Sequence, residues 1–402
     1  SQCRPAPLLN RRRTLTMKID EIQAVCFIGA GSMGCYNAIW AAVSGYDVVL
    51  YDINPETLDK APQRCLDMAG YLAGAGYCNA ADIPAARQRI SLVADLAQAT
   101  ANADLVSESV FERVDVKREV HAQLDSVCPA HTILTTNSST LLVSDIEDVV
   151  QRSDRFAALH FHMASPLVDI VPGPQASAAV VDILERYVLS LKGSPLVLKK
   201  EYPGYVLNAV LGPVLTTAQA LVVEGVASPE DVDRAWMSSR TALIGPFGLL
   251  DLFGLNLIYD KWQHRDDDGA IPGLRSGALD LLRPYVERGE LGMQSGKGFY
   301  RYPEPEYQQF GFLASEADLA SIAEPLTMAL VSSAILVAAA GVAEPEDIDR
   351  AWTVGVSLNT GPFEILQQLG ATEFLQRFSR HVDSGWFDAG RAEKVAAFVK
   401  TL

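Results

Sequence analysis

The sequence predicts an α/β protein: a doubly wound parallel sheet with helices on both faces, followed by an all-α region present in two copies. Three observations support this fold class. Short apolar strands alternate with helical stretches up to about residue 200. Beyond Tyr202-Pro203-Gly204, Ala, Leu and Val recur at three- and four-residue spacing, which is typical of helices. Part of this helical region then recurs 116 residues later.

The strands of the predicted sheet are short apolar runs, most of them separated by helical segments of about ten to twenty residues. Because this alternation places a crossover helix between successive parallel strands, we expect a sheet domain over residues 17–200. The seven runs span residues 24–29, 47–52, 89–93, 104–109, 132–136, 155–161 and 195–199.

The helical region contains an internal repeat. Gly225–Leu250 and Gly341–Leu366 are identical at 14 of 26 positions, and both contain the turn Gly-Pro-Phe. Self-similarity at a fixed offset indicates a repeated structural unit. We therefore expect a helical substrate and catalytic domain over residues 201–310 and a second, structural copy over residues 311–402. The apolar stripes of both copies are interpreted as packing faces.

Composition limits the function classes. The 402 residues include 33 Lys and Arg against 49 Asp and Glu, and the net charge of −16 argues against nucleic acid and anionic membranes as partners. We expect no apolar run that is long and charge-free enough to span a bilayer. The six cysteines form no CxxC pair, which is typical of a reducing compartment, so we expect a cytoplasmic protein.

The first 16 residues differ from the rest of the chain. They are polar, contain four arginines and precede Met17, which resembles a natural start. An Arg-rich leader is compatible with a transit peptide. Because the segment lacks a clear amphipathic pattern, we favour translated upstream or vector-derived sequence.

A glycine-rich turn follows the first predicted strand. The run Gly29-Ala30-Gly31-Ser32-Met33-Gly34 stands between a strand and a helical segment, the context in which GxGxxG indicates a Rossmann-type dinucleotide-binding fold. Gly29 permits the tight turn, Gly31 lets a pyrophosphate approach the backbone, and Gly34 lets the helix pack on the strand. Asp52 ends the next strand. Its carboxylate can accept from ribose hydroxyls and would repel a 2′-phosphate, so NAD is preferred over NADP.

A second group of polar residues lies where strands are predicted to end. The run Thr136–Thr140 places small hydrogen-bonding groups at the carboxyl end of a strand, where open α/β sheets bind ligands. His160 ends the strand at 155–161, and Asp169 lies on the next extended segment. A dehydrogenase must remove a hydroxyl proton as the hydride leaves. A histidine oriented by a carboxylate can do this near neutral pH.

Two other interpretations of this segment remain open. Taken alone, His160 fits a structural residue at a strand end as well as a general base. His162 can share a face with His160, and the pair with Asp169 has the make-up of a metal site. No further ligand pattern supports a metal, so we expect none. The remaining histidines are interpreted as ordinary surface or helix residues: His121, His131, His264 and His381.

Together these motifs resemble the L-3-hydroxyacyl-CoA dehydrogenase family, in particular 3-hydroxybutyryl-CoA dehydrogenases, from residue 22 to about residue 302 and again in the repeat. The matching stretches are GAGSMG, SESVFERVDVKREV, TTNSSTL, RFAALHFH, PLVDIVPG, PGYVLN, GPFGLLDLFGL and SGKGFYRYP. The resemblance implies a substrate cleft between a Rossmann domain and a helical domain. It also implies NAD-dependent oxidation of a short-chain (S)-3-hydroxyacyl-CoA to the 3-oxoacyl-CoA, as in β-oxidation of fatty acids.

The resemblance assigns roles by position. His160 is implied as the general base and Asp169 as its carboxylate partner, where the family usually has Glu. Ser139 is implied to bind the 3-oxygen of the substrate, and Asn208 completes the catalytic set. Without the resemblance, Glu112 and Lys117 would be interpreted as solvated helix charges. The cofactor residues beyond the glycine turn and Asp52 are Glu112, Lys117 and Asn137.

The sequence departs from the family pattern on the substrate side. Met163 stands where the family has Asn, Ala209 replaces a common Arg, and the stretch from His160 to Asp169 is about three residues short. These departures motivate an alternative: the same chemistry on a free 3-hydroxy acid such as carnitine or a sugar acid. A third hypothesis is a dinucleotide-dependent binding protein without catalysis, against which the complete catalytic set argues.

The repeat also bears on assembly. The position equivalent to Asn208 in the second copy is Glu324, so we expect one catalytic copy and one structural copy. The resemblance implies that single-unit relatives dimerise through their helical domains. A fused second copy can occupy that surface, so we expect a monomer with an internal pseudo-dimer of helical repeats, or otherwise a homodimer.

Overall fold

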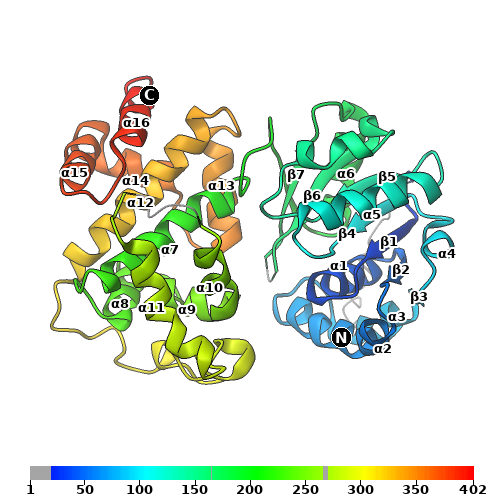
Figure 1. Ribbon diagram of the computed structural model, residues 1–402, viewed down its shortest axis with the longest axis horizontal. Coiled ribbons are helices and arrows are strands. Elements are labelled where there is room, and N and C mark those ends of the chain that lie inside the picture. Colours follow the sequence, from blue (N-terminus) through cyan, green and yellow to red (C-terminus); the bar gives the residue numbers. More distant parts are fainter. Residues whose placement is uncertain (1–19, 164, 266–269) are drawn as a thin grey trace, which may run out of the picture. The chain divides into compact units, whose positions relative to one another are not determined.

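The computed structural model describes residues 20–163, 165–265 and 270–402 (Figure 1). The chain forms two compact units. Of the described residues, the first comprises those up to Ser138 together with Val143–Pro195, and the second comprises those of Ser139–Leu142 and Leu196–Leu402. The leader expected over residues 1–16 lies outside the described residues.

The first unit contains an eight-stranded sheet in the order β3-β2-β1-β4-β5-β6-β7-β8. All seven predicted strands are present, most of them shortened by a residue at one or both ends. The paired strands from β3 to β6 are parallel, which confirms the doubly wound architecture. The bounds are β1 Ala24–Ile28, β2 Asp47–Tyr51, β3 Ile90–Val93, β4 Leu105–Glu108, β5 Ile133–Thr136, β6 Phe156–Phe161, β7 Leu167–Pro172 and β8 Ser194–Val197.

Strand β7 departs from the predicted parallel sheet, because it pairs with β6 in the antiparallel direction. The connection between these two strands is too short for a crossover helix, so the chain must turn back on itself. Every residue of β4, β5 and β6 is buried, as expected for strands with both faces covered. The helices of this unit are α1 Ser32–Val43, α2 Pro55–Gly74, α3 Ile83–Gln88, α4 Leu96–Thr100, α5 Val114–Val127 and α6 Ala178–Ser190.

The second unit is helical, as predicted. The helix α12 packs against α7 and α8, and Figure 1 shows it running beside α7. The helices of this unit are α7 Leu207–Val223, α8 Pro229–Arg240, α9 Pro246–Phe253, α10 Leu255–Gln263, α11 Leu274–Glu287, α12 Leu319–Ala339, α13 Pro345–Val356, α14 Pro362–Leu369, α15 Ala371–Asp383 and α16 Ala389–Val399.

The two helical segments share local structure at equivalent positions. Asp233 accepts hydrogen bonds from two backbone N–H groups at the start of α9, at 2.8 and 3.0 Å. Asp349, 116 residues later, does the same at the start of α14 with the same two distances. The preceding helices α8 and α13 each end on a left-handed residue, Thr241 and Ser357. These parallels are what a duplication requires, and the duplication itself stays a prediction.

The helix α12 corrects one expectation. By length and composition it is apolar enough to cross a membrane, whereas the sequence analysis expected no such run. In the structure, 72% of its most apolar window is buried inside the protein. That burial is typical of the central helix of a globular core.

Candidate functional site

The glycine-rich turn connects β1 to α1. Gly29 adopts a left-handed φ of +98°, and a Cβ on Gly34 would lie 1.8 Å from the carbonyl oxygen of Gly29. The fold itself therefore demands glycine at these two positions. A Cβ on Gly31, by contrast, would meet nothing within 4 Å, so this backbone faces open space at the amino terminus of α1. Open space, a helix amino terminus and no acidic residue in the first turn suit an anionic pyrophosphate.

Asp52 directly follows β2 and is fixed against the glycine turn. Its Oδ2 accepts a hydrogen bond from the backbone N–H of Ala30 at 2.8 Å, and its Oδ1 accepts from that of Asn54 at 2.8 Å. The side chain remains partly exposed, and each oxygen keeps a lone pair for a ribose hydroxyl. Arg64 of α2 donates a hydrogen bond to the carbonyl oxygen of Ala30. No sequence pattern predicted this contact.

Lys117 is not a solvated helix charge. Its ammonium lies 2.7 Å from Oε1 of Glu108 and 3.4 Å from Oε2 of Glu112, and only 1% of the side chain is exposed. Glu112 in turn accepts a hydrogen bond from Ser138 Oγ at 2.6 Å. The two predicted cofactor residues Glu112 and Lys117 therefore meet each other at the carboxyl ends of β4 and β5.

Glu108, at the end of β4, is a residue that the sequence analysis missed. Its Oε2 accepts from Thr136 Oγ1 at 2.8 Å and lies 3.1 Å from His121 Nε2. Burial favours a higher pKa for Glu108, but the hydrogen bond from His121 and the charge of Lys117 outweigh it and lower the pKa to about 2. His121 was expected to be an ordinary residue and is instead fully buried. The four-residue spacing of Lys117 and His121 places both on one face of α5, and that signal was available in the sequence.

Asn137 links two strands of the sheet. Its Oδ1 accepts a hydrogen bond from the backbone N–H of Phe161 at 2.8 Å, which ties the end of β5 to the end of β6. Two of the predicted catalytic residues, Ser139 and Asn208, belong to the second unit. Both are partly buried, and Asn208 lies in the first turn of α7.

His160 and Asp169 form a direct cross-strand pair. The register of β6 and β7 places them opposite each other, and His160 Nδ1 lies 3.0 Å from Asp169 Oδ2. The histidine side chain is 8% exposed and the aspartate side chain is fully buried. Antiparallel pairing brings opposite side chains within contact distance, so this pair follows from the register alone.

The electrostatics of the pair depend on a third side chain, His162. Its Nε2 lies 2.8 Å from the same Asp169 Oδ2. Burial, followed by the charge of His162, lowers the pKa of His160, and Asp169 opposes this shift. Burial alone would raise the pKa of Asp169, but the charge of His162 and the hydrogen bonds from both rings lower it to about 2. Among the described residues, these three side chains are grouped closely enough to hold a metal ion, with ligand atoms all within 4.8 Å of one another.

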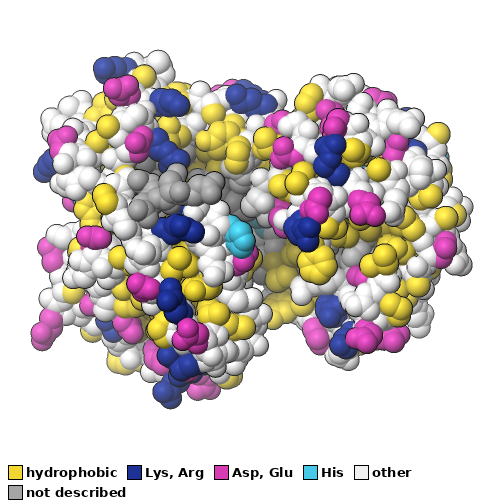
Figure 2. Space-filling model, in the orientation of Figure 1, with side chains coloured by type: hydrophobic (Ala, Val, Ile, Leu, Met, Phe, Trp, Pro, Cys, Tyr) yellow, Lys and Arg dark blue, Asp and Glu magenta, His cyan; other side chains and the backbone are white. Residues whose placement is uncertain are grey.

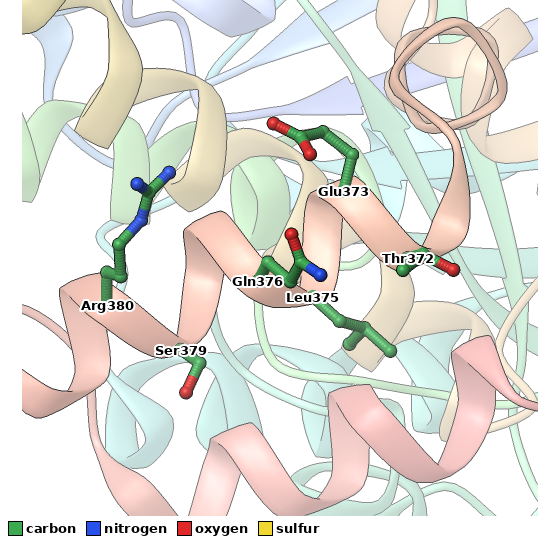
Figure 3. Close-up of a pocket in the computed structure, with 6 residues that line it drawn as sticks. All are labelled: Thr372, Glu373, Leu375, Gln376, Ser379 and Arg380. Carbon is green, nitrogen blue, oxygen red and sulfur yellow. The ribbon is translucent and has the colours of Figure 1, made fainter.

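Two surface hollows lie in the second unit. Figure 3 shows one on α15, lined by side chains such as Glu373 and Arg380, and it contains no predicted site residue. The other, of about 930 Å³, is lined by residues of α7, α12 and α16, including Ala209. On the face seen in Figure 2, acidic and basic side chains are interspersed.

Comparison with known proteins covers most of the chain. Residues 24–202 match the 3-hydroxyacyl-CoA dehydrogenase NAD binding domain, and residues 204–302 and 322–396 match the 3-hydroxyacyl-CoA dehydrogenase C-terminal domain. A probable 3-hydroxybutyryl-CoA dehydrogenase of Bacillus subtilis is 34% identical over 295 residues, which are 71% of this chain and 99% of that protein.

Two solved structures are also similar. A diketoreductase described as acting on dicarbonyl compounds is 36% identical over 70% of this chain and 99% of its own, with a TM-score of 0.64. The 3-hydroxybutyryl-CoA dehydrogenase of Escherichia coli K12 shares the fold over 94% of this chain and 99% of its own, with a TM-score of 0.75 at 23% identity. The chain therefore belongs to the 3-hydroxyacyl-CoA dehydrogenase family, whose members are NAD-dependent oxidoreductases acting on CH–OH groups.

Proposed function

We propose that this protein uses NAD to oxidise the 3-hydroxyl of a short-chain (S)-3-hydroxyacyl-CoA, with His160 as the general base. The observation that carries the proposal is the buried pair of His160 and Asp169, whose Nδ1 and Oδ2 atoms lie 3.0 Å apart. The name of the Bacillus subtilis relative, a probable 3-hydroxybutyryl-CoA dehydrogenase, supports the short chain length.

The residues of the first unit suit NAD. The open backbone at Gly31 and the amino terminus of α1 would hold the pyrophosphate, and Asp52 would accept from the ribose hydroxyls. The resemblance assigns Glu112 and Lys117 to the nicotinamide and its ribose. When bound, NAD supplies the acceptor for the hydride that leaves C3.

The proton follows a separate route. With Nδ1–H donated to Asp169, the tautomer of His160 carries no proton on Nε2, so this nitrogen is the one that can accept a proton. Nε2 takes the hydroxyl proton as the carbonyl forms, and the Asp169 carboxylate stabilises the resulting imidazolium. By resemblance, Ser139 and Asn208 donate to the developing 3-oxo group.

The test is steady-state oxidation of (S)-3-hydroxybutyryl-CoA with NAD. His160→Gln should lower kcat by about 10²- to 10⁴-fold, because it removes the base, while the Kd for NADH stays within about twofold. His131→Gln, a change at an exposed histidine, serves as the matched control and should leave kcat unchanged. A wild type inactive on every acyl-CoA, or a His160→Gln variant as active as the wild type, would disprove the proposal.

A second candidate substrate is a free 3-hydroxy acid or its ketone. It is favoured by the 36% identity to a diketoreductase and by the shortened, altered segment around Met163. A comparison of kcat/KM for acetoacetyl-CoA and for free 3-oxo acids with NADH decides between the two. Higher kcat/KM on the free acids would transfer the proposal to them, and turnover of CoA esters alone would reject this candidate.

We also infer that the two helical segments pair as an internal pseudo-dimer. Trp236 and Trp352 occupy equivalent positions, 116 residues apart, and their rings meet edge to face with centroids 6.3 Å apart. Equivalent residues that meet each other are typical of a two-fold interface. The segments would thereby cover surfaces that separate chains would otherwise use for dimerisation, which favours a monomer.

A further inference from the structure

Asp169 is shared by two imidazole rings. His160 Nδ1 and His162 Nε2 lie 3.0 and 2.8 Å from the same oxygen, Oδ2. The two rings contact each other edge to face, with centroids 4.3 Å apart. The other carboxylate oxygen, Oδ1, is buried and has no hydrogen-bond partner among the described residues. The two histidines are therefore the hydrogen-bond anchors that the described structure provides for this carboxylate.

The strand register explains this arrangement. Residues two apart in a strand point to the same face, so His162 shares the face of His160. Asp169 lies directly opposite His160 in the register of β6 and β7. His162 directly follows the end of β6, so it lies diagonally across from Asp169. Diagonal neighbours are within reach of a long side chain. The tight connection keeps His162 beside β7, since its backbone N–H still bonds the carbonyl of Leu167 at 3.4 Å.

We propose that His162 is a positioning residue for the base: it holds Asp169 in place through Nε2–H and, when protonated, disfavours the imidazolium of His160. This inference rests on the proposed function, because it assigns His162 a part in the same proton transfer. His162 touches neither the substrate nor NAD in this scheme, and it acts through Asp169.

The charges around the pair determine the direction of the effect. The ring of His162 and the carboxylate of Asp169 act on His160 at contact distance, and Glu112 acts from the segment before α5. Both carboxylates favour the imidazolium, whereas a protonated His162 opposes it. Without His162, Asp169 would serve His160 alone, and His160 would hold its proton to higher pH. With His162 present, the base becomes neutral, and so competent for oxidation, at lower pH.

The experiment compares His162→Phe with His162→Gln. Phe removes both the donor and the charge, whereas Gln keeps an N–H donor that can reach Asp169 and removes only the charge. The titration of the His160 imidazole is followed by NMR in the NADH complex, and kcat/KM for oxidation is measured against pH. We expect both variants to move the midpoint of the His160 titration to higher pH. The pH at which kcat/KM falls on the acidic side of its profile should rise with it. For a shift of one unit, the rate well below the midpoint falls about tenfold. At high pH the Gln variant should keep the wild-type kcat, whereas the Phe variant should lose part of it.

Several outcomes would overturn the inference. An unchanged His160 titration in both variants would show that His162 has no electrostatic role. Equal kcat of the Phe and Gln variants at high pH would show that the donor to Asp169 is not needed. If EDTA abolishes the wild-type activity and Zn²⁺ restores it, the cluster is a metal site instead. His131→Phe, at an exposed histidine, is the control and should shift nothing.

The titration by NMR needs no turnover, so the two proposals fail separately. A wild type inactive on both substrate classes would remove the proposed function, while a shifted His160 titration would still show the coupling of the rings. If His162→Phe does not fold, the titration and pH profile of His162→Gln still test the electrostatic part.

Discussion

Glu108 is a fully buried carboxylate whose charge is compensated by Lys117. The Lys117 and Glu108 side chains are 1% and 0% exposed, and their charged atoms lie 2.7 Å apart. Removing one partner of such a pair leaves an uncompensated buried charge. Lys117→Met should therefore lower the free energy of unfolding in urea by about 3–5 kcal/mol.

The matched control is Arg113→Met. Arg113 also pairs with a carboxylate, Asp115, but these side chains are 69% and 62% exposed. An exposed pair contributes less than about 1 kcal/mol. If Lys117→Met and Arg113→Met lower the free energy of unfolding by equal amounts, burial does not explain the contribution of the Lys117–Glu108 pair.

The same carboxylate predicts how stability depends on pH. The pKa of Glu108 falls from an ordinary 4.5 to about 2 in the folded protein. A lowered folded pKa stabilises the protein above the unfolded value, and the stabilisation is lost as pH falls from about 4.5 toward 2. Glu108→Gln should therefore flatten the loss of unfolding free energy over this range, measured by urea titrations at a series of pH values. A slope as steep as that of the wild type would show that other groups, such as Asp169, account for it.

At the scale of elements, the turn between β1 and α1 contains two glycines that we expect to have different roles. Gly34 is required for packing, and Gly31 is expected to matter for cofactor binding. Gly34→Ala would place a Cβ 1.8 Å from the Gly29 carbonyl oxygen, so α1 must move away from β1. We expect a loss of about 3 kcal/mol or more in unfolding free energy, measured by thermal or urea unfolding.

Gly31→Ala is the matched variant in the same turn. Its Cβ meets no atom within 4 Å, so stability should change by less than about 1 kcal/mol. NADH affinity, measured by fluorescence titration, should fall at least tenfold, because the methyl group occupies the space of the pyrophosphate. Unchanged NADH binding by Gly31→Ala would place the dinucleotide elsewhere.

At the scale of the whole molecule, the pseudo-dimer inference predicts a monomer. Multi-angle light scattering should give a mass near the 43.5 kDa of the chain across micromolar concentrations. Because Trp352 is 1% exposed, Trp352→Ala should lower the free energy of unfolding by about 3–5 kcal/mol. The mass from light scattering should still be that of a single chain. A dimer that buries α8 against the same helix of a second chain would refute the inference.

Much of this architecture could be predicted because it depends on local patterns in the sequence. Alternating apolar runs predicted seven strands, and the glycine spacing predicted the dinucleotide turn. The resemblance implied that Asp169 is the partner of His160, and the register of β6 and β7 in the structure places the two residues opposite each other. The antiparallel direction of β7 was not predicted, although the connection from β6, which is too short for a crossover helix, was visible in the sequence.

What the sequence determined by itself was the order of elements, the cofactor turn and the family, since these depend on spacing along the chain. What only the tertiary structure decided was burial and register. Burial turned Lys117 and His121 from ordinary helix residues into partners of Glu108. Register placed His160 and His162 on one oxygen of Asp169. The spacing along the chain shows which residues share a face of a helix or strand, but the surface that this face meets is decided only when the chain folds.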